Sequence, residues 1–250
     1  MMTEALPKQR LRVRFTRDET LKYIGHLDMA RTWQRIVRRA NLPLAYSEGF
    51  NPQPKMSFAA ALPVGCTSDH EELDLVLLPP CAIDEVKARL DRALPSGMKI
   101  ISLEEVPLNA PALQMQLLAA EFEITIEGEE TIGPLHERVQ QFMAASEVRR
   151  DRRGKVYNLR PLVQALSIEP GGALSAEQGR AGRADRAAVI RSRLQATPEG
   201  TGRPDELAAA LGLDPAAVKI KRTKLLFLDD TLPVRASAAK QAPTPRTDGA

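Results

Sequence analysis

Apolar positions along the first hundred residues follow two different periods. Residues 10–16 alternate Leu11, Val13 and Phe15 with three arginines, which predicts a half-buried strand. Residues 26–40 instead repeat apolar side chains at helical spacing, which predicts a helix with one buried side. The elements predicted in this half are a strand at 10–16, a helix at 26–40, strands at 54–61 and 72–78, a helix at 83–94 and a strand at 98–106. This order is typical of the ferredoxin-like split βαβ fold.

A similar order of elements follows a proline-containing connector. The predicted elements are a strand at 119–126, a helix at 132–145, a basic hairpin turn within 148–157, a short helix at 158–166, a strand at 187–195, a short helix between Pro204 and Gly212, and a strand at 217–228. We therefore predict an α+β fold with tandem ferredoxin-like (split βαβ) domains. The predicted organisation is a flexible N-terminus at 1–9, a first domain at 10–106, a connector at 107–118, a second domain at 119–228 with a mobile loop at 170–186, and a disordered tail at 229–250.

Positive charge is concentrated in one part of the sequence. Between Lys8 and Lys55 there are 11 lysines and arginines against 4 acidic residues, a net charge of +7, although the whole chain carries only +3. On the predicted strand, Arg10, Arg12 and Arg14 alternate with the apolar residues. Both helices of a ferredoxin-like domain cover one face of the sheet, so we expect these arginines to line the open face and to attract an anionic partner such as RNA.

The predicted helix at 26–40 carries a second group of arginines. Arg31, Arg35 and Arg38 follow one another at three- and four-residue steps and share a face, and Arg39 is the four-residue neighbour of Arg35. Such a row suits successive phosphates, because a guanidinium group forks onto phosphate oxygens. The alternative is a solvated helix face on which Asp28 pairs with Arg31.

The segment after this helix has the composition of a rigid binding loop. Tyr46 and Phe50 are suited to stacking on bases, Asn51 to hydrogen bonding and Lys55 to a phosphate. The alternative is a structural loop whose aromatic side chains belong to the core. The RNA-binding residues that we predict are Arg10, Arg12, Arg14, Arg31, Arg35, Arg38, Arg39, Tyr46, Phe50, Asn51 and Lys55.

Other classes of function lack their sequence signals. Cys66 and Cys81 lie in neither a CxxC pair nor a Cys/His cluster, which argues against a zinc knuckle or a cysteine-ligated cluster and favours a reducing cytosol. There is no Walker loop, HExxH or GxSxG motif, and we predict no metal site. The sequence has no apolar run of membrane-spanning length and no signal-peptide core at its N-terminus, so we expect a cytoplasmic protein without a membrane partner.

Several short runs resemble one family. They are GHLD at 25–28, LPLAYSEGFNPQPKMSF at 42–58 and LPVG at 62–65. They resemble the radical SAM-linked proteins, whose domain is catalogued as DUF2344, and the resemblance extends over residues 10–228. It implies a partner that is a cobalamin-binding radical SAM enzyme. S-adenosylmethionine, an iron–sulfur cluster and cobalamin would then belong to that partner, since this chain has no CxxxCxxC motif. The resemblance implies no catalytic residue.

Three hypotheses follow. In the first, the protein binds RNA or presents a substrate as an accessory to a separate radical SAM enzyme and has no catalysis of its own. In the second, it is a metal-independent RNA endonuclease in which His26, Tyr46 and Lys55 act on the RNA, although a histidine at a helix start is commonly structural. In the third, it is a protein–protein adaptor whose arginines meet an acidic partner. The oligomeric state stays open.

Overall fold

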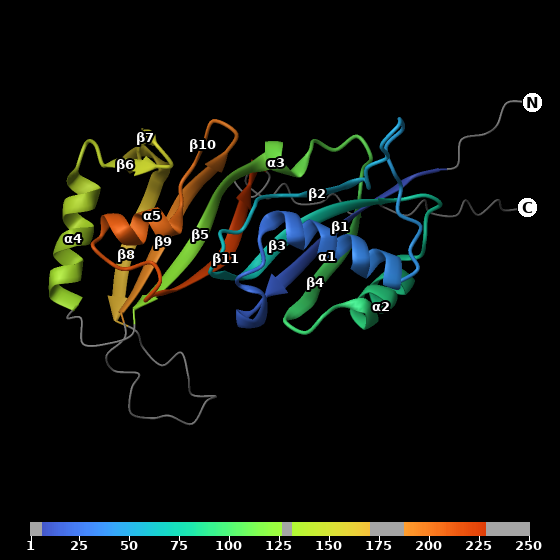
Figure 1. The fold of residues 1–250 in the computed structure, drawn as a ribbon, viewed down its shortest axis with the longest axis horizontal. Helices are drawn as coiled ribbons and strands as arrows, with labels where there is room; N and C mark the ends of the chain where they lie inside the picture. Colours follow the sequence, from blue (N-terminus) through green and yellow to red (C-terminus); the bar gives the residue numbers. More distant parts are fainter. Residues whose placement is uncertain (1–6, 127–131, 171–187, 229–250) are drawn as a thin grey trace, which may run out of the picture.

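The computed structural model describes residues 7–126, 132–170 and 188–228, and both predicted halves are built as α+β units (Figure 1). The first half comprises β1 (Gln9–Arg17), η1 (Glu19–Leu21), α1 (His26–Arg39), β2 (Met56–Phe58), β3 (Cys66–Leu77), α2 (Ile83–Ala93) and β4 (Met98–Val106). Its strands lie in the order β4-β1-β3-β2. This is the strand order of a ferredoxin-like fold, as the alternation of periods predicted.

The second half repeats that arrangement. It comprises α3 (Leu113–Gln116), β5 (Leu117–Ile126), α4 (Ile132–Ala144), β6 (Arg149–Arg152), β7 (Lys155–Asn158), η2 (Arg160–Leu162), β8 (Val163–Pro170), β9 (Ala188–Thr197), β10 (Gly200–Thr201), α5 (Pro204–Ala210) and β11 (Lys219–Phe227). Its main strands lie in the order β8-β9-β5-β11, and the β6–β7 hairpin forms a separate two-stranded sheet between α4 and β8.

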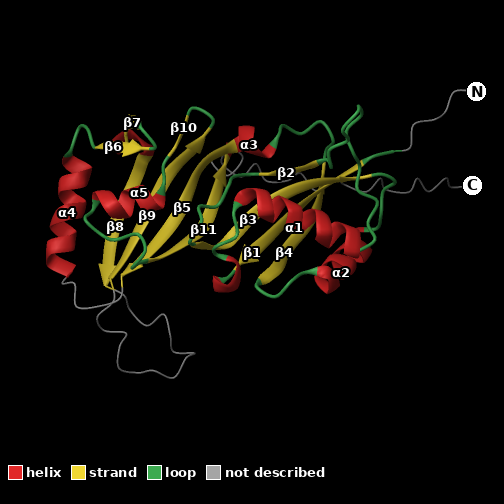
Figure 2. Cartoon of the chain, in the orientation of Figure 1, coloured by secondary structure: helices red, strands yellow, loops and turns green. Residues whose placement is uncertain are grey.

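The two halves share one sheet. Strand β11 pairs in parallel with the beginning of β3, with Ile220 opposite Cys66 and Arg222 opposite Ser68. Further along the same edge, β3 pairs with β2 instead, from Leu73 to Leu75. A nine-stranded sheet results. Figure 2 shows its strands side by side from one end of the molecule to the other, with α1 and α5 in front of them.

The helices cover two cores on this sheet. The first core packs α1 and α2 on β1, β3 and β4, and its centre is Trp33, whose ring meets Phe15 edge-on at 4.9 Å between centroids. The second packs α4 and α5 on β5, β9 and β11. A bulge sets three steps of β3 (Ser68 to Glu71) against two steps of β1 (Arg17 to Phe15), so alternate side chains before the bulge, such as Cys66, still face the helices.

Several local predictions differ from the structure. The strand predicted at 54–61 is shortened to β2 at Met56–Phe58. Residues 158–166 do not form a short helix: one 3₁₀ turn at Arg160–Leu162 leads into β8, because pairing with β9 takes over from Val163 onward. Strand β3 is longer than the predicted 72–78 and begins at Cys66, since its polar first half pairs with β11 from Cys66 to Ser68 and with β1 from Ser68 onward. Most of the predicted flexible N-terminus at 1–9, most of the predicted loop at 170–186 and the predicted tail at 229–250 lie outside the described residues. Within the described ranges, no helix is long and apolar enough to cross a membrane.

Candidate nucleic-acid interface

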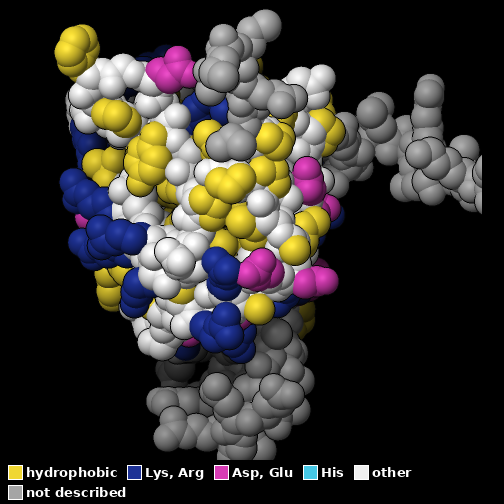
Figure 3. All heavy atoms as spheres, turned by 90° about the vertical axis from the view of Figure 1, so that its right-hand side faces the viewer, with side chains coloured by type: hydrophobic (Ala, Val, Ile, Leu, Met, Phe, Trp, Pro, Cys, Tyr) yellow, Lys and Arg dark blue, Asp and Glu magenta, His cyan; other side chains and the backbone are white. Residues whose placement is uncertain are grey.

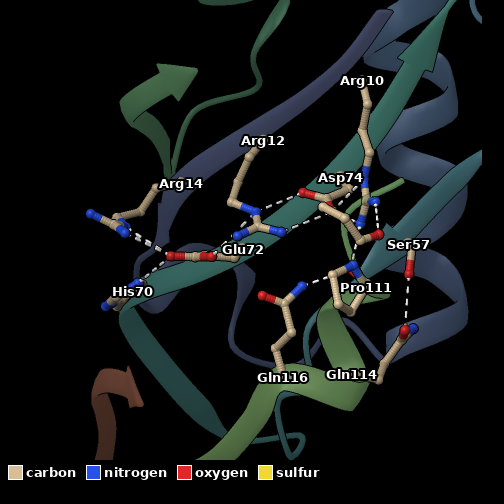
Figure 4. Close-up of polar contacts among 11 residues, drawn as sticks. Arg10, Arg12, Arg14, Ser57, His70, Glu72, Asp74, Pro111, Gln114 and Gln116 are labelled. Atoms are coloured by element: carbon tan, nitrogen blue, oxygen red, sulfur yellow. Dashed lines mark hydrogen bonds and ion pairs between the residues drawn. The ribbon is translucent and has the colours of Figure 1, made fainter. Parts of the chain in front are cut away.

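Arg10, Arg12 and Arg14 of β1 lie on the face of the sheet opposite the helices, as their alternation with apolar residues predicted. All three form ion pairs with carboxylates of β3 (Figure 4). Arg10 Nε donates to Asp74 Oδ2 at 3.0 Å, and Arg12 Nε donates to Asp74 Oδ1 at 2.9 Å. Arg14 Nη2 donates to Glu72 Oε1 at 2.8 Å. Both carboxylates are buried. The open face therefore holds an ion-pair network and not the free row of cations that the sequence predicted.

Electrostatics stabilise this network in its ionised form. Burial acts to raise the pKa of Glu72, but hydrogen bonds from His70 and Arg14 outweigh it, so the pKa lies below its usual value. His70 Nε2 lies 2.9 Å from Glu72 Oε1. Burial likewise acts to lower the pKa of Arg12, and contact with Asp74 outweighs it. Glu72 is thereby held in its charged form beside Arg14 and His70.

Helix α1 presents its arginines differently. Met29, Trp33 and Ile36 are buried against the sheet at three- and four-residue spacing, which turns the arginine row toward solvent. Asn41 ends the helix in a left-handed conformation (φ 51°). Arg31 pairs with Asp28 at 3.0 Å, and both side chains are exposed.

The last three arginines of α1 form an uncompensated group. Arg35, Arg38 and Arg39 are exposed, and within the described residues none of them has an ion pair or a side-chain hydrogen bond. Arg38 and Arg39 also lie in the last helical turn, where a positive charge complements the helix dipole. We call Arg35, Arg38 and Arg39 the α1 basic patch.

The predicted loop is a short hairpin. Ser47 N donates to Gln53 O at 2.8 Å, and Gln53 N donates to Ser47 Oγ at 2.9 Å, which closes the tip. Gly49 adopts a φ of +121°, a conformation that L side chains rarely adopt. Phe50 at the tip is fully exposed and Tyr46 is 55% exposed, so neither is the core residue of the structural alternative. Asn51 is exposed beside Phe50.

The hairpin continues directly from the α1 basic patch. Residues 40–45 connect the end of α1 to Tyr46, and Figure 1 shows both at the end of the molecule distant from α4. Figure 3 views that end directly. Lys and Arg side chains gather along its left side, which is the side of α1, and hydrophobic side chains lie exposed beside and above them. A basic helix surface thus adjoins a rigid loop with exposed aromatic rings.

Lys55 belongs to a different surface. Its backbone joins the sheet, since Val76 N donates to Lys55 O at 3.0 Å and Lys55 N donates to Ala45 O at 2.8 Å. Its side chain lines a groove on the open face together with Arg10 and Asp74. The sequence placed Lys55 with the helix arginines, but the sheet separates them.

The residues of the nuclease hypothesis make separate contacts in the described part of the chain. The His26 ring meets Phe58 edge-on at 5.4 Å between centroids, at the start of α1. Tyr46 is bridged to Pro54 in the hairpin. Within the described part of the chain, no hydrogen bond or ion pair joins His26 to Tyr46 or Lys55. A general acid and a general base need to reach the same substrate and not each other, so the nuclease hypothesis stays a prediction.

Sequence reasoning missed the acids that neutralise the open face. Alternation along β3 puts Glu72 and Asp74 on one face of their strand, but no local pattern identifies them as partners of β1. Further cross-strand pairs on this face are Lys221 with Asp69, Arg191 with Glu123 and Glu169, and Arg193 with Glu121. Alternation along a strand predicts on which face of the sheet a charged side chain lies. Its ion-pair partner becomes known only from the pairing of strands that are distant in the sequence. Among the described residues, no group of three or more His, Cys, Asp or Glu side chains is arranged to hold a metal ion.

Comparison with known proteins places the chain in a family. No curated protein matches it. Solved structures that resemble it include a chain of a Cbf5–Nop10–Gar1 complex, with 14% identity, 85% of this chain and 48% of that chain covered, and a TM-score of 0.41. This chain therefore spans about half the length of that one. An unknown protein from Galdieria sulphuraria matches with 17% identity, coverage of 88% and 99%, and a TM-score of 0.26.

A third resemblance is to a putative glycine cleavage system transcriptional repressor, with 11% identity, coverage of 88% and 98%, and a TM-score of 0.23. With TM-scores below 0.5, none of these three resemblances indicates a function for this protein. A family model described as "Uncharacterized protein conserved in bacteria (DUF2344)" matches residues 10–204, which is most of the chain. The protein therefore belongs to the DUF2344 family.

Proposed function

We propose that this protein is a non-catalytic accessory protein that binds single-stranded RNA through the α1 basic patch and the exposed residues of the adjoining hairpin, Tyr46, Phe50 and Asn51. The observation that carries the proposal is the contrast between two sets of arginines. Those on β1 are held by buried carboxylates, whereas Arg35, Arg38 and Arg39 are exposed and unpaired within the described residues. An external polyanion is a partner that such a group suits.

The helix and the hairpin together offer contacts to both the phosphates and the bases of one RNA strand. Arg38 and Arg39 lie about 4.5 Å and 6 Å along the helix axis from Arg35, so neighbouring phosphates of one strand can be contacted along α1. Stacking of a base on an exposed ring is worth about 1–3 kcal/mol, and it tolerates any sequence. Phe50 and Tyr46 supply two exposed rings, and Asn51 an amide for base edges. Such an interface binds unpaired RNA in preference to duplex.

A partner enzyme is part of the proposal. From the family resemblance, we propose that the RNA, or a substrate carried with it, is presented to a separate radical SAM enzyme. In that arrangement S-adenosylmethionine, the iron–sulfur cluster and cobalamin belong to the enzyme, and this chain contributes binding and orientation.

Salt dependence of RNA binding tests the interface. We expect the affinity for a mixed-sequence single strand, measured by fluorescence anisotropy, to fall with salt at a log–log slope of about 0.7 per phosphate contact. Replacing Arg35, Arg38 and Arg39 with Ala removes up to three contacts and should lower that slope by about 2. The matched control replaces Arg191, Arg193 and Lys221 with Ala. It removes the same charge from the opposite face of the sheet and should leave the slope unchanged.

Further measurements separate the alternatives. Phe50→Ala should weaken binding about fivefold or more, because one stacking contact is lost. The RNA should stay intact after incubation with the pure protein. Site-specific cleavage that disappears in His26→Ala would establish the nuclease hypothesis instead. Absence of RNA binding at low salt, together with capture of an acidic protein, would replace RNA with a protein partner.

A further inference from the structure

A groove on the open face lies apart from the α1 basic patch. It has a volume of about 350 Å³ and lies between the 54–57 segment and the 108–112 connector, with Asp74 and Val76 of β3 among its lining residues. The remaining residues that line it are Arg10, Pro54, Lys55, Met56, Ser57, Leu108, Ala110 and Ala112. Most of these are apolar, as is usual for the binding pocket of a small molecule.

Hydrogen bonds hold the connector in place over the sheet (Figure 4). The Arg10 guanidinium donates to the carbonyl oxygens of Ala110 and of Pro111, the latter at 3.0 Å. Gln116 Nε2 donates to the same Pro111 oxygen at 2.6 Å. Ser57 Oγ donates to Gln114 Oε1 at 3.1 Å and joins β2 to α3. The walls are therefore tied to one another and the groove is preformed, which lowers the entropic cost of binding.

The charges in the groove do not balance. Both oxygens of Asp74 already accept hydrogen bonds, from Arg10 and from Arg12. Lys55 has no ion pair or side-chain hydrogen bond within the described residues. One positive charge therefore remains uncompensated beside apolar walls formed by Leu108 and Val76.

We propose that this groove binds a small molecule that carries a single anionic group, a carboxylate or a phosphate monoester, on an apolar body. Lys55 receives the anionic group, and the apolar body lies between the connector and β2. A charge-assisted hydrogen bond to Lys55 supplies orientation, and removal of apolar surface from water supplies most of the affinity. This site is independent of RNA binding, since α1 covers the other face of the sheet.

Three probes with the same apolar body and different head groups test the proposal: octanoate, octyl phosphate and octanol. Binding to the full chain is followed by calorimetry and by backbone amide chemical shifts. At least one anion should bind about tenfold or more tightly than octanol, because only the anion forms the charge-assisted bond. The largest shifts should fall at Ser57, Val76 and Ala110. The stronger of the two anions identifies the head group as carboxylate or phosphate.

Variants locate the charge. Lys55→Gln should abolish the preference for anions and leave octanol binding unchanged, whereas Lys99→Gln, a lysine on β4 that does not line the groove, should change neither. Leu108→Ser should weaken all three probes. The proposal fails if octanol binds as well as the anions, if Lys55→Gln retains the preference, or if the shifts map to α1. The α1 patch variant should bind the probes normally, so either proposal can fail without the other.

Discussion

At the scale of single residues, the availability of each arginine depends on its nearest acid. Arg12 and Arg38 both lie within the basic segment of the sequence, yet Arg12 faces Asp74 at 2.9 Å and Arg38 faces solvent. A buried carboxylate holds its arginine strongly, because separating the pair leaves an uncompensated charge away from water. Local charge density along the chain therefore overstated the cationic character of the open face.

Glu72 gives this network a pH dependence. Its pKa in the folded protein lies below the ordinary 4.5, so the ionised form stabilises the fold at pH values above 4.5, and that contribution is lost as the pH falls through the folded pKa. We expect the free energy of unfolding, from urea titrations at pH 7, 5, 4 and 3, to fall on acidification. Glu72→Gln should be less stable at pH 7 and show a smaller fall. Glu147→Gln, at an exposed position, should follow the wild type, and an unaltered fall in Glu72→Gln would contradict this role.

At the scale of elements, turns determine how the helices dock. The turn between α2 and β4 packs against the start of η1, where Asp18 N donates to Gly97 O at 3.0 Å. Gly97 has a φ of +88°, and a Cβ there would lie 2.2 Å from Thr20 Oγ1 and 2.5 Å from Asp18 Oδ1. Asp18 Oδ1 also caps η1 by accepting from Thr20 N at 2.8 Å. Glycine is thus required both by the backbone conformation and by the contact.

Gly97→Ala should therefore destabilise the protein by about 1–3 kcal/mol, since the backbone is strained and the cap must shift. Gly133→Ala is the matched control. Gly133 sits in the first turn of α4, and apart from its chain neighbours and its own helix backbone no atom of the described residues lies within 4 Å of a Cβ there, so alanine should be neutral or slightly stabilising. Thermal unfolding followed by circular dichroism measures both. Equal melting temperatures for the two variants would show that the Gly97 turn relaxes without cost.

At the scale of the whole molecule, a buried ion pair joins the two halves. Arg222 on β11 donates its Nε to Glu71 Oε1 on β3 at 2.9 Å, and its Nη1 to Ala61 O at 3.3 Å. Ser68 Oγ donates to Arg222 O at 3.3 Å across the same parallel pairing. Both charged side chains are almost completely buried. The pair lies where the two cores meet, so it couples the stability of one half to that of the other.

Removing one partner of this pair should be far worse than removing both. Arg222→Met leaves the Glu71 carboxylate buried without its cation, which costs about 3–5 kcal/mol. Combining it with Glu71→Leu replaces the pair by apolar side chains and should recover much of that loss. Urea unfolding of the two single variants and the double variant measures the coupling. Additive losses would mean that the two residues contribute independently.

The sequence by itself determined the elements and their order. Alternation at 10–16 and helical spacing at 26–40 appear in β1 and α1 almost unchanged, because each pattern reflects one buried side of a regular element. The tandem split βαβ architecture followed from that order, and the basic turn within 148–157 became the β6–β7 hairpin. Glycine, two prolines and aromatic residues marked the 46–55 loop, whose tip is exposed as the binding hypothesis requires.

Only the tertiary structure decided which of these features face one another. Asp74 lies 64 positions from Arg10 in the sequence, and β-sheet register alone brings them into contact. Pairing with β9 likewise turned residues that we predicted as a helix into strand β8, and pairing with β1 extended β3 through polar positions. The sheet also put Lys55 on the face opposite to the α1 arginines. Periodicity reports whether a side chain is buried, but the identity of its neighbour depends on pairings between distant strands, which no local pattern encodes.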